Sequence, residues 1–192
     1  MRKLLKLNTG IMTLSITVLL LSAASSSAQK LPKSIHIQAQ AMGTSTQMGR
    51  SANITIIINE VSPAADQKIL MEAFQTNGNE GLVNALSKMK SKGRMAVTGT
   101  LGGDLAYIRK FSLPDGGTKL RLVTNRLLRF GEVWGDTRTT DYELSAAEII
   151  VSKSGKKSGT LMPASKLKLD KNGKLELELY QNPWRLTNIQ LR

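Results

Sequence analysis

Residues 105–126, LAYIRKFSLPDGGTKLRLVTNR, decide the fold class of this chain. Successive side chains of a strand point to opposite sides, which places these four on one face: Leu105, Tyr107, Arg109 and Phe111. In Pro114–Gly117, proline fixes φ, the aspartate can bond local backbone, and the glycines allow the chain to reverse. Leu120 and Leu122 then alternate with charged residues. The stretch therefore predicts an antiparallel hairpin with one buried and one solvated face.

The same pattern of short alternations and turns fills the chain from Gly93 to Arg192. Asn172-Gly173 is typical of a tight hairpin turn, because both residues accept a positive φ. Lys174 to Tyr180 alternates strictly, and Pro183 separates it from a last strand at Trp184 to Leu191. We predict a mainly antiparallel sheet of about seven to eight strands, strongly curved or barrel-like.

One helical pair precedes this sheet. Asn53 to Val61 is rich in isoleucine and predicts a buried strand. Ser62-Pro63 predicts a helix start, with serine capping free amides and proline at the first helical position. Asn77-Gly78 ends the first helix, and Glu80 to Lys90 predicts a second. The expected fold class is α+β, with one helical hairpin packed on the sheet.

The N-terminus predicts export. Met1–Ala28 has a basic start, an apolar stretch and small residues at its end, which is typical of a cleaved signal peptide. We expect a flexible lead over 29–50, within which Ser34 to Ala41 alternates enough for a short strand. A single domain is expected over 51–192. The predicted location is periplasmic or secreted, with no membrane span after cleavage.

Composition limits the chemistry. The chain has no cysteine and one histidine, His36, which excludes thiol catalysis and metal sites built from cysteine or several histidines. We expect no cofactor. Lys and Arg number 27 against 14 Asp and Glu, and the formal charge of +13 favours anionic partners such as phosphate-bearing envelope polymers, lipid headgroups or nucleic acid. A merely solvated basic surface is the alternative.

Two short segments hold the candidate binding residues. The first gives Trp134, Arg138 and Tyr142, and the second gives Tyr180, Trp184 and Arg185. A tryptophan can stack on a sugar or base, and an arginine can bind an anion. The alternative is that these aromatic residues cap the core. Glu132 and Asp141 have the residue type needed for acid and base roles in a hydrolase.

Four segments carry a resemblance that spans about Ser62 to Leu191: Lys92-Gly93-Arg94, Leu122 to Arg126, Arg138 to Tyr142, and Pro183 to Leu186. On these segments the chain resembles an uncharacterised group of exported, sheet-rich bacterial proteins. The resemblance implies export and a sheet-rich fold, and it brings no activity. The element order is also similar to helix-grip lipid-binding folds, which end in a long helix where this chain ends in a strand.

Together these features predict a non-catalytic exported binding or envelope-associated domain rather than an enzyme. Its ligand would be an anionic envelope component, held on the basic surface, or a small apolar ligand. Two alternatives are a carboxylate-dependent hydrolase acting on an envelope polymer and a secreted nucleic-acid binder. Aromatic residues make up only 4% of the chain, which disfavours a surface built on base stacking.

Overall fold

A computed structural model describes residues 34–125, 128, 143–169 and 175–192 of the chain. These residues form nine strands, a short 3₁₀ turn and the helix α1. In chain order they are β1 (Ile35–Met42), η1 (Ser45–Gln47), β2 (Ser51–Ile58), α1 (Ala64–Lys88), β3 (Gly93–Val97), β4 (Gly103–Ser112), β5 (Thr118–Thr124), β6 (Leu144–Val151), β7 (Lys157–Leu169), β8 (Leu175–Leu179) and β9 (Trp184–Leu191).

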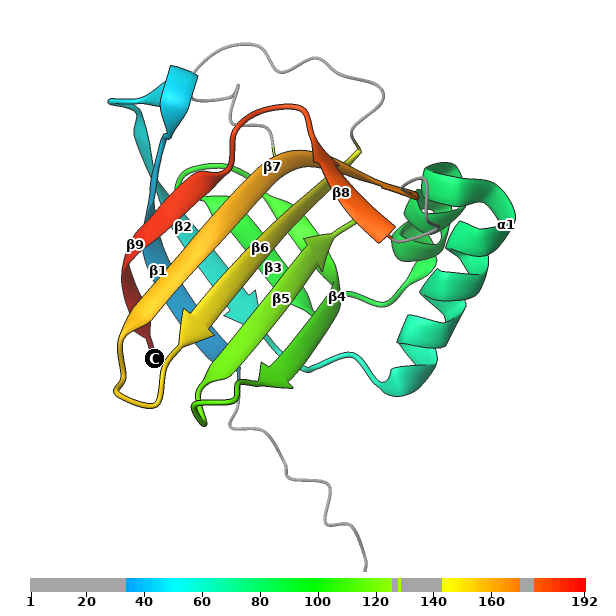
Figure 1. Cartoon of the computed structure of the whole chain (residues 1–192), viewed down its shortest axis with the longest axis horizontal. Coiled ribbons are helices and arrows are strands. Elements are labelled where there is room, and N and C mark those ends of the chain that lie inside the picture. Colours follow the sequence, from blue (N-terminus) through cyan, green and yellow to red (C-terminus); the bar gives the residue numbers. More distant parts are fainter. Residues whose placement is uncertain (1–33, 126–127, 129–142, 170–174) are drawn as a thin grey trace, which may run out of the picture. The chain divides into compact units, whose positions relative to one another are not determined.

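Eight of these strands close into an antiparallel barrel (Figure 1). From β1 to β7 each strand pairs with the next one in the chain. The last strand, β9, lies between β1 and β7 and closes the ring. The predicted class, α+β with a barrel-like antiparallel sheet, is therefore confirmed.

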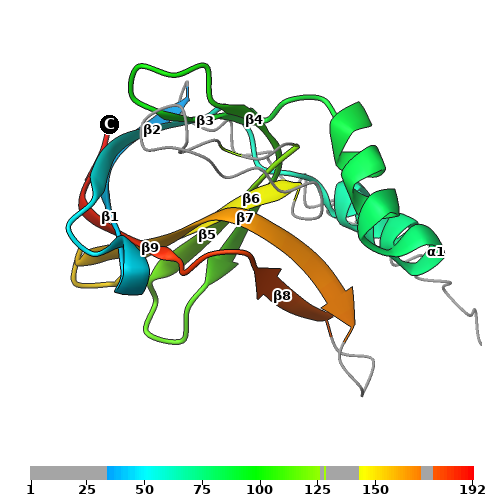
Figure 2. The ribbon, with the colours of Figure 1, turned by 90° about the horizontal axis from the view of Figure 1, so that it is seen from above.

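The strand β8 does not belong to the ring. It pairs with Ser165–Leu169 of β7, whereas β9 pairs with Gly159–Leu161 on the same strand. The second half of β7 and β8 thus form an arm that extends away from the barrel (Figure 2). The segment between β8 and β9 contains Pro183, where the sequence predicted a break.

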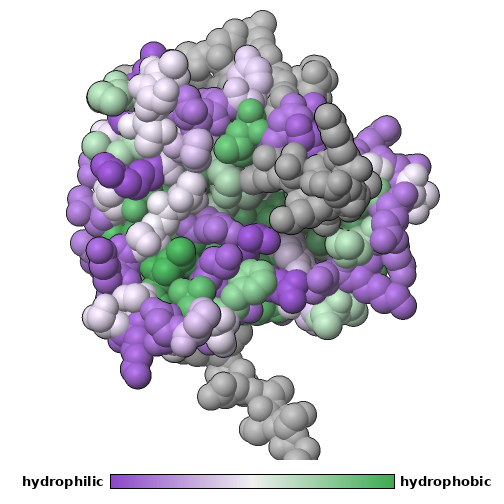
Figure 3. All heavy atoms as spheres, viewed as in Figure 1, coloured by the Kyte–Doolittle hydropathy of each residue, from purple (hydrophilic) through white to green (hydrophobic). Residues whose placement is uncertain are grey.

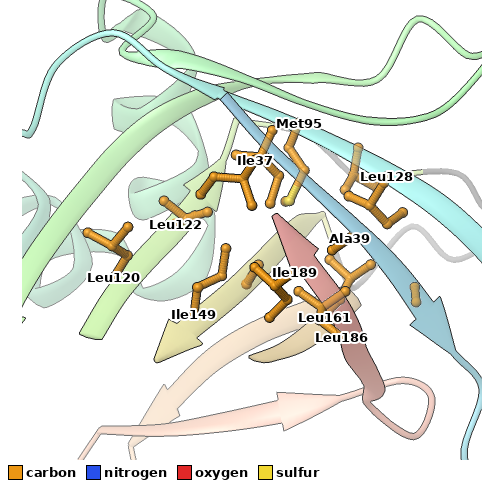
Figure 4. Packing of buried hydrophobic residues seen from close by; sticks show 14 of the residues in the cluster. Ile37, Ala39, Met95, Leu120, Leu122, Leu128, Ile149, Leu161, Leu186 and Ile189 are labelled. Atoms are coloured by element: carbon orange, nitrogen blue, oxygen red, sulfur yellow. The ribbon is translucent and has the colours of Figure 1, made fainter. Parts of the chain in front are cut away.

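Apolar side chains from all eight barrel strands fill the interior (Figure 4). Five of these side chains are 0% exposed to solvent: Ile37, Ile56, Leu122, Ile149 and Leu161. Core residues recur at every second position of a strand, as Ile54, Ile56 and Ile58 do on β2, because alternate residues of a strand face the same side. This alternation also fixes which side chains point outward from the barrel.

A bulge in β4 changes one predicted face. The pairing of β4 with β5 shifts register between Leu105 and Tyr107. The extra residue, Ala106, turns the strand so that Leu105 and Ile108 both belong to the interior core. Placing Leu105 on one face with Tyr107 was therefore wrong, because Leu105 faces the interior while Tyr107 packs with the α1 cluster outside it.

The helix α1 consists of the two predicted helical segments. They are separated at Asn77 and Gly78, where the backbone is not helical and Gly78 has φ 57° and ψ −140°. Such a φ favours glycine. Four buried residues of α1 pack outside the barrel on Ala106 and Leu144: Leu70, Phe74, Leu82 and Leu86. The helices therefore pack on the sheet, as predicted.

Ser62 does not cap α1. The residue before the helix is Pro63, and no side chain caps its free amides. Ser62 instead binds β4: its N–H donates to the Ile108 carbonyl at 2.9 Å, and its Oγ accepts from the Ile108 N–H at 3.0 Å. The predicted capping role was wrong because β4 offers both partners in strand-like geometry.

The domain also begins earlier than predicted. The segment 29–50, expected as a flexible lead, contains β1, which pairs with β2 over its whole length and with β9. Ile37, Ala39 and Ala41 of β1 are buried in the core. The domain boundary at 51 was therefore wrong, because three small or branched apolar residues at alternate positions suffice for a barrel strand. The predicted signal peptide, Met1–Ala28, lies outside the described residues.

Candidate anion-binding face

Three cations gather on the outer face of β4 and β5. Arg121 lies between the buried Leu120 and Leu122, Lys119 comes directly before Leu120, and Arg109 comes directly after the buried Ile108. Arg109 and Lys119 lie on the same outer face by the same alternation. Figure 3, drawn with β5, β6 and β7 in front, shows hydrophilic side chains bordering hydrophobic ones on this side of the barrel.

The three cations surround one aromatic ring, that of Phe111. Its centroid lies 4.9 Å from Arg109 Cζ, 5.1 Å from Lys119 Nζ and 5.5 Å from Arg121 Cζ. A cation this close to a ring face is attracted by the ring quadrupole. Phe111 therefore holds the three positive side chains together, although it removes none of their charge.

One carboxylate, that of Glu148 on β6, forms ion pairs with two of these cations. Its Oε1 accepts from Arg121 Nε at 2.8 Å and lies 2.6 Å from Arg121 Nη2. The same oxygen is 3.8 Å from Lys119 Nζ. Arg109 forms no ion pair within the described residues. The five residues, which we call the basic face, are Arg109, Phe111, Lys119, Arg121 and Glu148, and they carry two net positive charges.

The strand register places two of these cations directly opposite each other. Arg109 of β4 pairs with Arg121 of β5, and Arg121 pairs with Glu148 of β6. Like charges directly opposite on neighbouring strands destabilise a sheet. Glu148 offsets the charge of Arg121, so the repulsion that remains comes from Arg109. Arg109 thus combines this repulsion with its attraction to the ring of Phe111.

The surroundings leave the basic face open on one side. Tyr107 and Val123, the outward residues of the next row, pack against the α1 cluster. In the opposite direction lie the β4–β5 turn and the β6–β7 turn, which contains Lys153 and Lys156. The side chain of Arg121 remains 48% exposed, and those of Lys119 and Glu148 about a quarter exposed at 24% and 27%. A ligand can therefore reach these groups from solvent.

Of the six predicted binding residues, Trp134, Arg138 and Tyr142 lie outside the described residues, as do Glu132 and Asp141. Trp184 is only 2% exposed and belongs to the interior core. Arg185 is the next residue of β9 and points outward, while Tyr180 is 51% exposed before the strand begins. Trp184 and Arg185 thus lie on opposite faces of one strand and do not form a common platform.

The segment that holds Tyr180 also packs on the β1–β2 connection. Gln47 Nε2 donates to Gln181 Oε1 at 2.5 Å, and Thr44 Oγ1 donates to the Pro183 carbonyl at 2.6 Å. Gln47 is only 8% exposed. These contacts hold the segment between β8 and β9 on the barrel. They account for its conformation and give no indication of a ligand.

A second charged cluster is structural. Lys92 precedes β3, and its Nζ lies 3.0 Å from Glu60 Oε1 and 3.5 Å from Asp66 Oδ2. Glu60 follows β2, Asp66 lies in the first turn of α1, and Lys92 follows that helix, so the cluster joins the segments before and after α1. The hydrogen bond to Glu60 and the charge of Asp66 raise the pKa of Lys92 against the opposing effect of burial. The hydrogen bond from Lys92 and the positive charge of Lys92 lower the pKa of Glu60.

Sequence reasoning missed the basic face, although a signal for it was present. The alternation on either side of Pro114–Gly117 places Arg109 and Arg121 outward on adjacent strands, and the length of the turn determines that they face each other. The pairing of Glu148 with Arg121 had no such signal, because the connection between β5 and β6 is long.

Within the described residues, no group of three or more His, Asp or Glu side chains is arranged to hold a metal ion. In the same part of the chain, no helix is both long enough and apolar enough to cross a membrane. No protein-family model, no curated protein and no solved structure matches the chain.

Proposed function

We propose that the chain is an exported, non-catalytic binding domain whose basic face binds an anionic component of the cell envelope. One observation carries the proposal: Arg109 lies directly opposite Arg121 beside Lys119, with a single carboxylate to balance the three. Local rules of stability are most often broken at functional sites. An anion bound here would relieve the repulsion that the fold itself leaves.

The interior supports a surface site over the alternative of a small apolar ligand. Core side chains come from all eight barrel strands. An eight-stranded barrel is either filled by side chains or holds one small ligand, and the complete burial of core residues such as Ile56, Leu122 and Leu161 favours the filled form. Export rests on the signal-like sequence of Met1–Ala28, and the absence of catalysis is part of the proposal. The hydrolase alternative would use Glu132 and Asp141, outside the described residues, so no observed geometry favours it.

Titration of the chain with inorganic polyphosphate at several salt concentrations tests the proposal. The double variant Arg109→Gln/Arg121→Gln should bind less tightly, and the slope of log K against log salt should fall by about 0.7 for each lost phosphate contact. Arg50→Gln/Arg94→Gln is the matched control, because it removes two positive charges at exposed arginines that lie outside the basic face.

Three outcomes would contradict the proposal. In the first, Arg109→Gln/Arg121→Gln and the control Arg50→Gln/Arg94→Gln bind polyphosphate equally well. In the second, binding does not depend on salt. The third is a wild-type chain that binds an apolar fluorescent probe inside the barrel and shows no affinity for any polyanion. A circular dichroism spectrum of each variant confirms that the sheet is intact before binding is compared.

A further inference from the structure

The outer face of the barrel carries a longer row of polar side chains than the basic face alone. Arg121 pairs with Glu148 of β6, Glu148 with Thr160 of β7, and Thr160 with Arg185 of β9. With Arg109 opposite Arg121, the row crosses five adjacent strands. Because the register aligns these residues directly, they form a line that runs across the strands.

All five side chains point outward. The members of the row on β6, β7 and β9 each lie next to an inward residue of their own strand: Glu148 beside the buried Ile149, Thr160 beside the buried Leu161, and Arg185 between Trp184 and Leu186 of the core. Neighbouring strands lie about 4.8 Å apart, so the row from Arg109 to Arg185 measures about 19 Å along the curved backbone of the barrel, and its outward side-chain ends lie farther apart. This length exceeds that of a single phosphate or carboxylate.

The ends of the row differ from its middle. Arg109 and Arg185 make no ion pair in the described part of the chain. Glu148, in the middle, is already neutralised by Arg121 and Lys119. Thr160 adds a hydroxyl group, which can donate a hydrogen bond to a phosphate oxygen. The two unpaired guanidinium groups therefore flank a middle section that does not repel an anionic chain.

A guanidinium group matches the oxygens of a phosphate with two parallel hydrogen bonds. A single phosphate can occupy only one end of the row. A chain of linked phosphates can place one group at Arg109 and Arg121 and another at Arg185, and the second contact then forms within the same complex. The length of the row therefore selects for linear ligands.

We propose that the ligand is a linear phosphate polymer that lies across β4, β5, β6, β7 and β9 and that Arg185 binds its far end. This inference rests on the proposed function, because it extends the same site. It gives Arg185 a role in binding without Trp184, which faces the core. It also predicts that affinity rises with chain length until the polymer spans the row.

Titration of the full chain with phosphate, pyrophosphate and polyphosphates of increasing length tests the inference. Arg185→Gln should weaken the binding of polyphosphates longer than about 19 Å by about fivefold, the contribution of one cation near an anionic surface. It should leave the affinity for pyrophosphate unchanged. Arg94→Gln, with the same change in net charge on another face, should alter neither.

The variants separate the failure of this inference from that of the proposed function. If Arg185→Gln binds long polyphosphate as tightly as wild type while Arg109→Gln does not, the inference is overturned and the proposed function stands. If neither variant differs from wild type, both fail. Equal loss of pyrophosphate and long-chain binding in Arg185→Gln also overturns the inference, because Arg185 would then act without regard to length.

Two further probes distinguish the sources of such a polymer. Single-stranded oligothymidylate supplies linked phosphodiesters, and vesicles with an anionic phospholipid supply phosphates on a surface. Length-dependent binding of oligothymidylate that Arg185→Gln reduces would support the inference and point to a phosphodiester polymer. Binding to vesicles with none to any soluble polymer would overturn it, because a flat array of headgroups does not require a row.

Discussion

On β5, Leu120 and Leu122 point into a core in which their neighbours are apolar, whereas Lys119 and Arg121 point outward beside Arg109. The inner face follows from burial alone, since each side chain there removes apolar surface from water. The outer face places like charges together and balances them incompletely. Adjacent residues of one strand thus differ in role: the inner ones stabilise the core, and the outer ones form the basic face that we propose to bind an anion. Four substitutions test this contrast.

The largest effect is expected from Leu122→Ala. Leu122 is fully buried, so the substitution removes apolar contacts and leaves a cavity, and the free energy of unfolding should fall by about 2–5 kcal/mol. Arg121→Ala, one residue away, should change it by less than about 0.5 kcal/mol. Urea denaturation measures both. Similar losses for the two variants would show that the faces do not differ.

Lys92→Met should lower the free energy of unfolding by about 2 kcal/mol, less than for a fully buried ion pair because Glu60 is 45% exposed. The pKa of Lys92 is raised above 10.5, so its contribution is complete below pH 10.5 and is lost as pH rises through the raised value. The pKa of Glu60 is lowered from 4.5, so its contribution is present above pH 4.5 and is lost as pH falls through the lowered value.

Denaturation of wild type and Lys92→Met across this pH range checks the sign. The difference between the two chains should be greatest between the two ordinary pKa values and should shrink on both sides. Polyphosphate affinity should not change, because the Lys92 cluster lies apart from the basic face. A stability difference that is constant at all pH values would mean that packing of the lysine side chain, rather than its charge, is responsible.

Glu148→Gln should separate stability from binding. Removing the carboxylate takes the ion-pair partner from Lys119 and Arg121 and should lower the free energy of unfolding by about 0.5–1 kcal/mol. The affinity for polyphosphate should rise, since two cations are released to the ligand. Glu178→Gln is the control, because Glu178 also contacts two lysines, Lys166 and Lys168, on the arm formed by β7 and β8. This control should lose stability without gaining affinity.

The smallest effect is expected from Arg109→Gln. It removes the like charge opposite Arg121 and should raise the free energy of unfolding by about 0.2–0.5 kcal/mol. Added salt should abolish the gain, because it screens exposed charges. Arg94→Gln should show no such gain. A loss of stability in Arg109→Gln would mean that its contact with Phe111 outweighs the repulsion.

Much of this architecture was readable in the sequence because it is local. The turn after β4 is fixed by Asp115, whose Oδ1 accepts from the Gly117 N–H at 2.9 Å, and the register of β4 with β5 follows from it. The break at Asn77-Gly78 was likewise predicted from the residue types. Both features depend on residues within a few positions of each other.

What the sequence did not reveal depends on distant partners. Ring closure by β9 joins residues more than 140 positions apart in the chain, as Gln40 with Thr187 shows. The bulge at Ala106 arises where β4 must serve both the interior and the α1 contact. The predicted binding residues were aromatic residues and arginines near loops. The basic face instead consists of charged strand residues that come together only through the register of β4, β5 and β6.

The closure of the barrel by β9 also bears on how the chain folds. His36 and Arg192 exchange two backbone hydrogen bonds, at 2.9 and 2.8 Å, where β1 meets the residues after β9. Until β9 has joined the ring, β1 and β7 each present an open edge, and such edges are templates on which other chains aggregate. A folding intermediate that lacks β9 is therefore exposed to aggregation until the last strand of the chain pairs.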